Sequence, residues 1–363
     1  MIRHFKNILV FLLACLGACL QYSCSTDINL YPDNWETEYI VHCIIDCQND
    51  KQNAFIQLTS NPLDPESRNS NINDLFYNEH QLIIQEWYQD EYAEYLMDPV
   101  SIFQEDIPSS PSSALFSASF NPYMFMDYKL VLKNQQSGRI LTAKTKPVPD
   151  PIVLQPHSLG TFYNFSDIDH PFTVKYKAIP RGYVYRIGFK IKYVELTESQ
   201  DTLYKTATFE MNPVYVDDPP AYVPTREVEG KLITKDMPLD YLLNIHARCI
   251  PELKNLKLRW LHSFDFTIWA GNEDLKKYLQ IAENFSDNRK QFFSNINNGY
   301  GLFGAANYIT ITDVAADDGF LKSLSSSERT SHLKFVKYPF NGPFRTEGME
   351  NNAINLNMLN INN

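Results

Sequence analysis

The segment EWYQDEYAEY, residues 86–95, gathers carboxylates and aromatic rings in one short stretch of the chain. Such clusters occur on sugar-binding surfaces and in glycosidases, where two carboxylates must face each other at a defined separation. Spacing along the chain does not fix that separation, and a β-hairpin with an aromatic face explains the same pattern. We therefore expect a hairpin here and assign no catalytic role to its carboxylates.

The segment DVAADDG, residues 313–319, is a second candidate, because calcium is bound by several oxygen ligands. It lacks the alternating acidic positions and the closing glutamate of an EF-hand loop, so we expect a solvated turn. The eight histidines are scattered, no serine lies in a nucleophile-elbow context, and no HExxH motif occurs. The sequence thus predicts a non-enzymatic protein with no catalytic residue, metal or cofactor.

The segment GYGLFG matches the pattern GxGxxG at Gly299, Gly301 and Gly304. A dinucleotide-binding loop of this kind must follow a strand and open a helix. Here the order is reversed, because a predicted helix precedes the glycines and a predicted strand follows them. We expect a structural turn that seats Tyr300 and Phe303 against the second domain.

Three of the six cysteines, Cys15, Cys19 and Cys24, lie near the N-terminus, behind a basic segment and a short apolar run over residues 8–20. This run is shorter than the roughly 20 residues that span a membrane, and its arrangement is typical of a secretory signal. Its cysteines resemble the lipidation site of a bacterial lipoprotein signal. We predict a signal peptide over residues 1–23 and lipidation at Cys24, with Cys19 as the alternative. The acyl chains would hold the protein permanently on a membrane.

The other cysteines are Cys43, Cys47 and Cys249. If residues 43–47 form a strand, the first two lie roughly 13 Å apart, beyond the Cα separation of about 4.4–6.8 Å that a disulfide spans. They cannot bridge each other in that case. Pairing of either Cys43 or Cys47 with Cys249 stays open.

The charge of the chain argues against nucleic acid as a partner. The formal net charge is −11, and removal of residues 1–23 takes away Arg3 and Lys6 but no acid. A basic footprint of the kind that binds nucleic acid is therefore absent, and attraction to anionic lipid head groups is disfavoured. The aromatic content of 13% is high and glycine is sparse, which suits a mainly β chain.

Short strands separated by polar turns fill the first half of the chain, and this spacing predicts a β-sandwich. The predicted strands cover residues 38–45, 54–59, 81–88, 114–120, 128–132 and 139–143. Residues 60–74 and 97–113 read as loops, and 340–363 as a loose Asn-rich tail. Alternate prolines over residues 147–151 cannot continue a ladder, so we place a stiff connector there.

The second half contains longer alternating runs. Residues 182–196 place one apolar face of tyrosines, isoleucines and phenylalanine on a single long strand. Further strands are expected over 201–211, 227–234 and 256–269. One helix is predicted over 273–285, with Asn272 as its N-terminal cap.

The segment FSNINNGYGLFGA, residues 293–305, resembles the signature of a family of Bacteroidota lipoproteins known as domain of unknown function 4249. Other matches are CSTD at 24–27, YIVHC at 39–43, and YKLVL with AKTKPVP at 128–132 and 143–149. The strand over 263–269 also lies where the family has one. The likeness spans residues 24–310, although residues 60–125 match poorly and only the glycine motif is specific.

The resemblance implies two β domains, the first immunoglobulin-like, and an outer-membrane partner such as a TonB-dependent transporter or another barrel protein. With the residue patterns, it predicts a tether over 24–36, an immunoglobulin-like β-sandwich over 37–146, the connector over 147–151, and a larger antiparallel β domain with one short helix over 152–339. We expect a lipid-anchored accessory or ligand-capture subunit on the cell-surface or periplasmic face of the outer membrane. The alternatives are an extracytoplasmic glycan or peptide hydrolase, and a structural subunit of envelope-assembly machinery.

Overall fold

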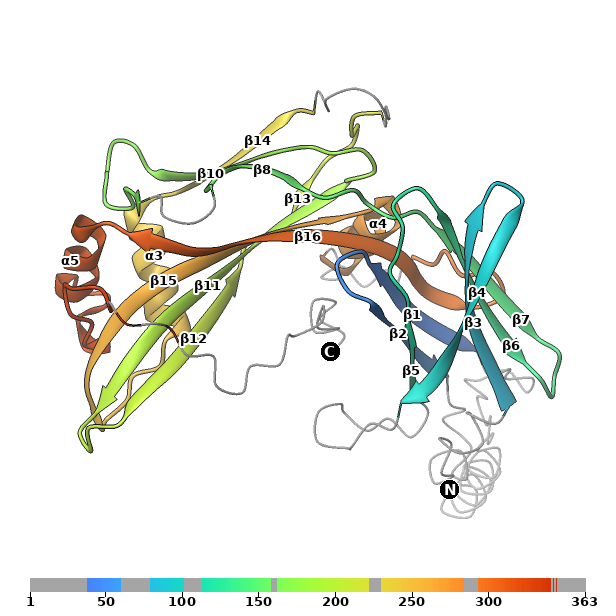
Figure 1. The fold of residues 1–363 in the computed structure, drawn as a ribbon, viewed down its shortest axis with the longest axis horizontal. Coiled ribbons are helices and arrows are strands. Elements are labelled where there is room, and N and C mark those ends of the chain that lie inside the picture. The colour runs from blue at the N-terminus through green and yellow to red at the C-terminus, as the bar shows by residue number, and fades with distance from the viewer. Residues whose placement is uncertain are drawn as a thin grey trace, which may run out of the picture. The chain divides into compact units, whose positions relative to one another are not determined.

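A computed structural model describes residues 38–59, 79–100, 113–157, 162–221, 230–283, 293–340, 342 and 344. The protein is mainly β, as the sequence predicts, with large sheets dominated by antiparallel pairs (Figure 1). The signal segment, the proposed tether, both candidate lipidation cysteines and most of the Asn-rich tail lie outside the described residues, as does the predicted loop over 60–74.

The first half of the chain forms seven strands. They are β1 (Tyr39–Asp46), β2 (Lys51–Leu58), β3 (His80–Tyr88), β4 (Glu91–Val100), β5 (Ser113–Ser119), β6 (Asp127–Asn134) and β7 (Ile140–Thr145). Strand β4 extends into the region predicted as the loop over 97–113, because its last residues pair with β5. That part of the loop prediction is wrong.

The second half contains the other strands and three described helices. The strands are β8 (Ile152–Gln155), β9 (Phe162–Tyr163), β10 (Phe172–Lys177), β11 (Val184–Thr197), β12 (Thr202–Glu210), β13 (Val214–Tyr215), β14 (Leu232–Met237), β15 (Leu256–Gly271) and β16 (Tyr300–Ala316). The helices are α3 (Leu239–Cys249), α4 (Glu273–Glu283) and α5 (Asp318–Ser326), followed by the 3-10 turn η2 (Ser331–Leu333).

The helix predicted after Asn272 is confirmed as α4, and the Asn272 side chain accepts the first-turn bond from the amide of Leu275 (3.1 Å). The expectation of a single helix is wrong. Helix α3 buries Leu242, Leu243 and Ile245 in the hydrophobic core of the second half of the chain. Helix α5 begins inside the acidic segment that was expected to be a turn.

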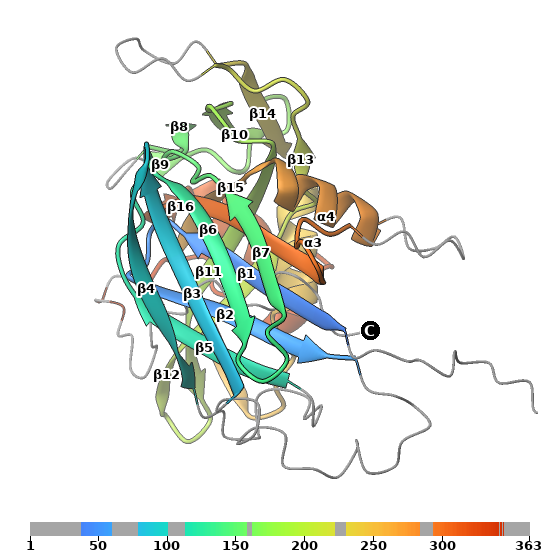
Figure 2. The same cartoon turned by 90° about the vertical axis from the view of Figure 1, so that its right-hand side faces the viewer.

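Most strands belong to one sheet with the order β12–β11–β15–β16–β1–β2–β5–β4–β3–β6–β7. Strand β13 lies beside β11 and β9 beside β16, while β14, β10 and β8 form a smaller sheet. Figure 2 faces strands β4, β3, β6 and β7, with β1, β2 and β5 behind them. Side chains from both sets of strands form a common core that includes Val41, Ile56, Leu82 and Leu130.

Strand β16 joins the two halves of the chain. Its first part pairs in parallel with β1, from Ile40 opposite Tyr300 onward, and its later part pairs antiparallel with β15. It thereby adds Phe303 and Ala305 to the core of the first half. The connector over 147–151 therefore separates two cores but not two sheets, and independent folding of 37–146 and 152–339 stays a prediction.

The proline connector is fixed to this shared strand. The amide of Asn307, on β16, donates to the carbonyl oxygen of Val148 and to Asp150 Oδ1, both at 2.9 Å. Gln48, in the β1–β2 turn, donates to Asn307 Oδ1 (2.8 Å) and to Asp150 (3.2 Å). Asn307 is 2% exposed and its bond to the Val148 carbonyl is buried, so this bond is shielded from water and holds the connector along the sheet.

Candidate functional site

Strands β3 and β4 form the hairpin that the aromatic and acidic segment predicts, with Gln89 and Asp90 at its turn. Their register places Trp87 opposite Tyr92 and Gln85 opposite Glu94. Since successive side chains of a strand point to opposite faces, these four side chains share the outer face of the hairpin. Glu86 points the other way, toward the sandwich core.

The inner face is fixed by hydrogen bonds to Glu86. The hydroxyl of Tyr95 donates to one carboxylate oxygen (2.8 Å), and the hydroxyl of Tyr128 donates to the other. The ring of Phe120 stacks on Tyr95, with centroids 4.2 Å apart. Burial raises the pKa of the Tyr128 hydroxyl, and its bond to Glu86 raises that pKa further, so this phenol remains a donor.

The adjoining loop between β5 and β6 is tied to the same network. The backbone N–H of Tyr123 donates to the Tyr128 hydroxyl (2.7 Å). Arg181 donates to the carbonyl oxygens of Met124 (3.0 Å) and Pro147 (3.2 Å). These bonds hold the loop beside the hairpin tip, where Tyr123 is strongly exposed.

The outer face presents rings and hydrogen-bonding groups together. The rings of Trp87 and Tyr92 stack with centroids 4.4 Å apart. The indole N–H of Trp87 donates to Gln85 Oε1 (3.3 Å), and the Gln85 amide donates to Glu94 Oε1 (2.8 Å). Half of the Tyr92 side chain is exposed, at 50%. The arrangement offers a stacking surface beside fixed polar groups.

The two carboxylates nearest the middle of the hairpin do not form a glycosidase pair. Glu86 lies opposite Ala93, and Glu94 lies opposite Gln85, so the two carboxylates point to opposite faces of the same strands. A sugar ring cannot lie between them. This geometry favours binding over hydrolysis at this hairpin.

The three glycines lie at the start of β16, beside β1. Gly301 has φ +114°, and a Cβ there would lie 2.0 Å from the carbonyl oxygen of Val41. Phe303 packs in the core of the first half, and Tyr300 is 49% exposed. We expected Tyr300 and Phe303 to pack against the second domain, and this prediction is wrong. The start of β16 pairs with β1 and so lies against the first half of the chain. Gly301 permits the close approach of the two strands.

The acidic segment 313–319 is not the solvated turn that we expected. Asp313 accepts hydrogen bonds from Lys192 Nζ and Ser263 Oγ, each at 3.0 Å. Asp317 caps α5 by accepting from the amide of Phe320 (3.1 Å), and it also binds the backbone N–H of Phe165 (2.6 Å). These carboxylates link strands and a helix.

Ser263 and His262 also lie beside Asp313, with 2.7 Å between His262 Nδ1 and Ser263 Oγ. The serine hydroxyl donates to Asp313, so its proton is directed to the carboxylate rather than to the imidazole. A nucleophilic serine needs the opposite order, with the histidine accepting its proton. Ser263 is 2% exposed, and its role in this cluster is structural.

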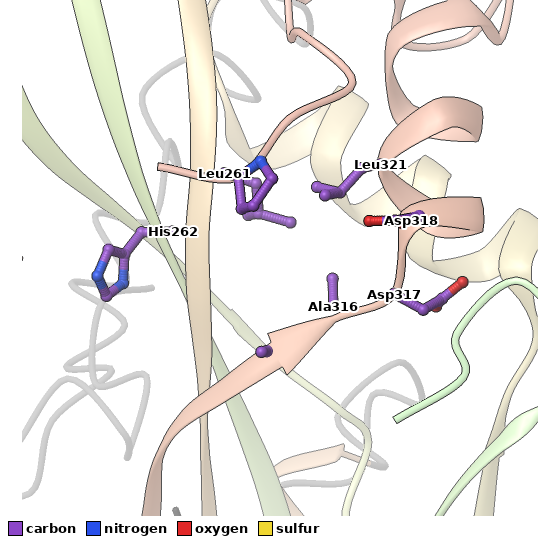
Figure 3. Close-up of a pocket in the computed structure, with 8 residues that line it drawn as sticks. Leu261, His262, Ala316, Asp317, Asp318 and Leu321 are labelled. Atoms are coloured by element: carbon purple, nitrogen blue, oxygen red, sulfur yellow. The ribbon is translucent and has the colours of Figure 1, made fainter. Parts of the chain in front are cut away.

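A cavity of about 420 Å³ adjoins this region. Figure 3 shows Leu261, Ala316 and Leu321 around a common space, with Asp318 at its edge and the His262 imidazole beyond β15. Asp317, which also lines it, is engaged in capping α5. Ligand pockets combine apolar walls with several convergent polar groups, and this cavity has few of them. The hairpin face is the better candidate.

Cys43, Cys47 and Cys249 are free thiols in the structure. Burial raises the pKa of Cys43 and of Cys47 to about 12, so both remain protonated at neutral pH. Among the described residues, no cluster of histidine, cysteine and carboxylate side chains is arranged to hold a metal ion. No helix in the described ranges is long and apolar enough to cross a membrane.

Comparison of the chain with known protein families gave no match, and neither did comparison with curated proteins.

Proposed function

We propose that this protein is an outer-membrane lipoprotein, lipidated at Cys24, that captures a ligand for a TonB-dependent transport or envelope complex without catalysis of its own. The observation that carries the capture role is the β3–β4 hairpin. Its outer face exposes Tyr92 beside fixed polar groups, while the Glu86 bonds hold its inner face. A site that is already ordered loses little conformational entropy when a ligand binds.

The anchoring half of the proposal is supported by the order of residues at the N-terminus. The N-terminus matches a lipoprotein signal, because a basic segment and a short apolar run precede Cys24 and polar residues follow it. With Cys24 as the attachment point, residues 25–37 would lie between the lipid and the first described residue, Glu38. In this proposal the protein stands on the cell-surface or periplasmic face of the outer membrane.

The resemblance to the Bacteroidota lipoprotein family is a further support for the proposal. The mainly β architecture agrees with the β domains that the resemblance implies. We propose an immunoglobulin-like arrangement for the strands between residues 37 and 146, and a transporter barrel as the partner.

Affinity purification of the tagged full-length protein from detergent-solubilised membranes tests this function. We expect a TonB-dependent transporter to co-purify, and we expect the Cys24→Ala variant to lose it together with membrane attachment. Recovery of envelope-assembly machinery instead of a transporter, or of no membrane protein at all, would contradict the proposal.

A further inference from the structure

The exposed ring of Tyr92 lies at the open side of the hairpin. Trp87 stacks against one side of this ring, and the side chain is still 50% exposed. The opposite side of the ring therefore faces solvent. Flat apolar surfaces of this kind bind ligands that present a flat apolar face of their own.

Strand β4 also has a free edge beside this ring. Its pairing with β5 covers only Asp98–Val100, and among the described residues no strand pairs with Glu91–Met97 on the side away from β3. Half of the backbone N–H and C=O groups in an antiparallel strand point away from a given neighbour. The edge therefore supplies further donors and acceptors next to Tyr92.

The charged residues of the hairpin itself are acidic, and the nearest lysines lie on the strands beyond β3. Gln85 is flanked by Glu94 on β4 and by Lys129 on β6. Asp127, on the neighbouring rung, forms an ion pair with Lys146 (3.1 Å). The carboxylates of Asp90, Glu91 and Glu94 lie nearest to Tyr92 along the chain, so the face disfavours an anionic ligand.

These features favour one ligand class. Interface cores between proteins are depleted of charged side chains, whereas Glu94 lies next to the exposed ring. Helices and loops that lie on anionic membranes carry basic side chains around their apolar residues, whereas residues 86–98 contain carboxylates and no lysine or arginine. A sugar has an apolar C–H face and hydroxyls that both donate and accept hydrogen bonds, which matches an exposed ring beside a carboxylate and the free backbone groups of a strand edge.

We propose that the outer face and free edge of β4, around Tyr92 and Glu94, bind a neutral oligosaccharide chain. This inference rests on the proposed capture function and names its ligand class. One sugar ring stacks on Tyr92, and its hydroxyls donate to Glu94. Successive rungs on one face lie about 7 Å apart, so the next sugar along the chain reaches Glu94, whose carboxylate is held by the buried Gln85 amide.

The test screens the full-length protein in detergent against an array of neutral and charged glycans, followed by calorimetric titration of each glycan that binds. We expect at least one neutral oligosaccharide to bind. Tyr92→Ala should weaken that binding about tenfold or more, which corresponds to about 1.4 kcal/mol. Glu94→Gln should weaken it less, because the amide retains one acceptor oxygen.

Tyr300→Ala is the matched control, because Tyr300 is exposed to a similar extent, 49% against 50%, and lies on β16. We expect it to bind like the wild type. Failure of all neutral glycans, binding of charged glycans alone, or equal binding by the Tyr92→Ala and Tyr300→Ala variants would overturn the proposal. If glycan binding fails while a transporter still co-purifies with the wild type, only the ligand class is wrong and the proposed function stands.

Discussion

Replacement of Gly301 by alanine should destabilise the protein strongly, because this residue lies where two distant parts of the chain meet. Its φ of +114° is a conformation that residues with a Cβ rarely adopt, and its Cβ would lie 2.0 Å from the Val41 carbonyl oxygen and 2.8 Å from the Val41 nitrogen. The backbone strain amounts to about 1–3 kcal/mol. Relief of the clash requires β1 and β16 to separate, which sacrifices ladder hydrogen bonds with a net value of roughly 1 kcal/mol each.

Together these terms reduce the free energy of unfolding by about 3–5 kcal/mol, against a typical total of about 5–15 kcal/mol. Gly304→Ala is the matched control on the same strand. A Cβ at Gly304 meets its nearest atoms at 3.5 Å, which is ordinary van der Waals contact. We expect its free energy of unfolding to change by less than about 1 kcal/mol.

Urea unfolding of the purified full-length variants, followed by circular dichroism, measures both values. Equal unfolding midpoints for the Gly301→Ala and Gly304→Ala variants would refute the reasoning. A Gly301→Ala variant of normal stability that no longer binds a partner would show that the glycine segment is an interaction loop instead.

Three further predictions follow from the structure. His246 and His42 are buried, and burial lowers the pKa of each imidazole from 6.5 to about 4. The folded state therefore favours the neutral ring, and the stability that depends on it is fully present above pH 6.5. As the pH drops toward 4, the free energy of unfolding should fall by about 3 kcal/mol for each ring. His246→Leu should flatten this dependence in urea unfolding at pH 4–7, and an unchanged slope in that variant would contradict the reasoning. Asn307→Ala leaves the Val148 carbonyl and the Asp150 carboxylate without their shared donor. We expect the free energy of unfolding to fall by about 1–3 kcal/mol and protease to cleave faster within residues 147–151. An unchanged cleavage rate would contradict this prediction. Cys24→Ala should leave the protein unlipidated in mass spectrometry while Cys19→Ala stays lipidated, and lipid found on Cys19 would reverse the assignment.

The strands could be predicted from the sequence because their signals are local. The alternation over residues 182–196 predicts a strand with one apolar face, and Tyr185, Ile187 and Phe189 are buried on one side of β11. The ring and carboxylate pattern predicts the β3–β4 hairpin for the same reason. Both patterns depend on residues that are close together in the chain.

The pairing of β1 with β16 could not be predicted in this way, because nothing near Val41 indicates that Gly301 will lie beside it. The glycines indicate that another backbone segment comes close, but they do not indicate which strand that is. Helix α5 was missed for a different reason. Asp317 is an N-cap followed by the buried Phe320, Leu321 and Leu324, and this pattern was hidden when the neighbouring acids were interpreted as a turn.

The position of β16 also sets the order in which the protein can mature. Ile40, near the start of the described chain, pairs with Tyr300, near its end, so the edge of β1 has no such partner until residue 300 and the strand that follows it have been synthesised. Contacts between such distant residues form slowly, and an unpaired strand edge attracts other chains in the meantime. The first half of the sheet is therefore completed last, by a strand from the far end of the described chain.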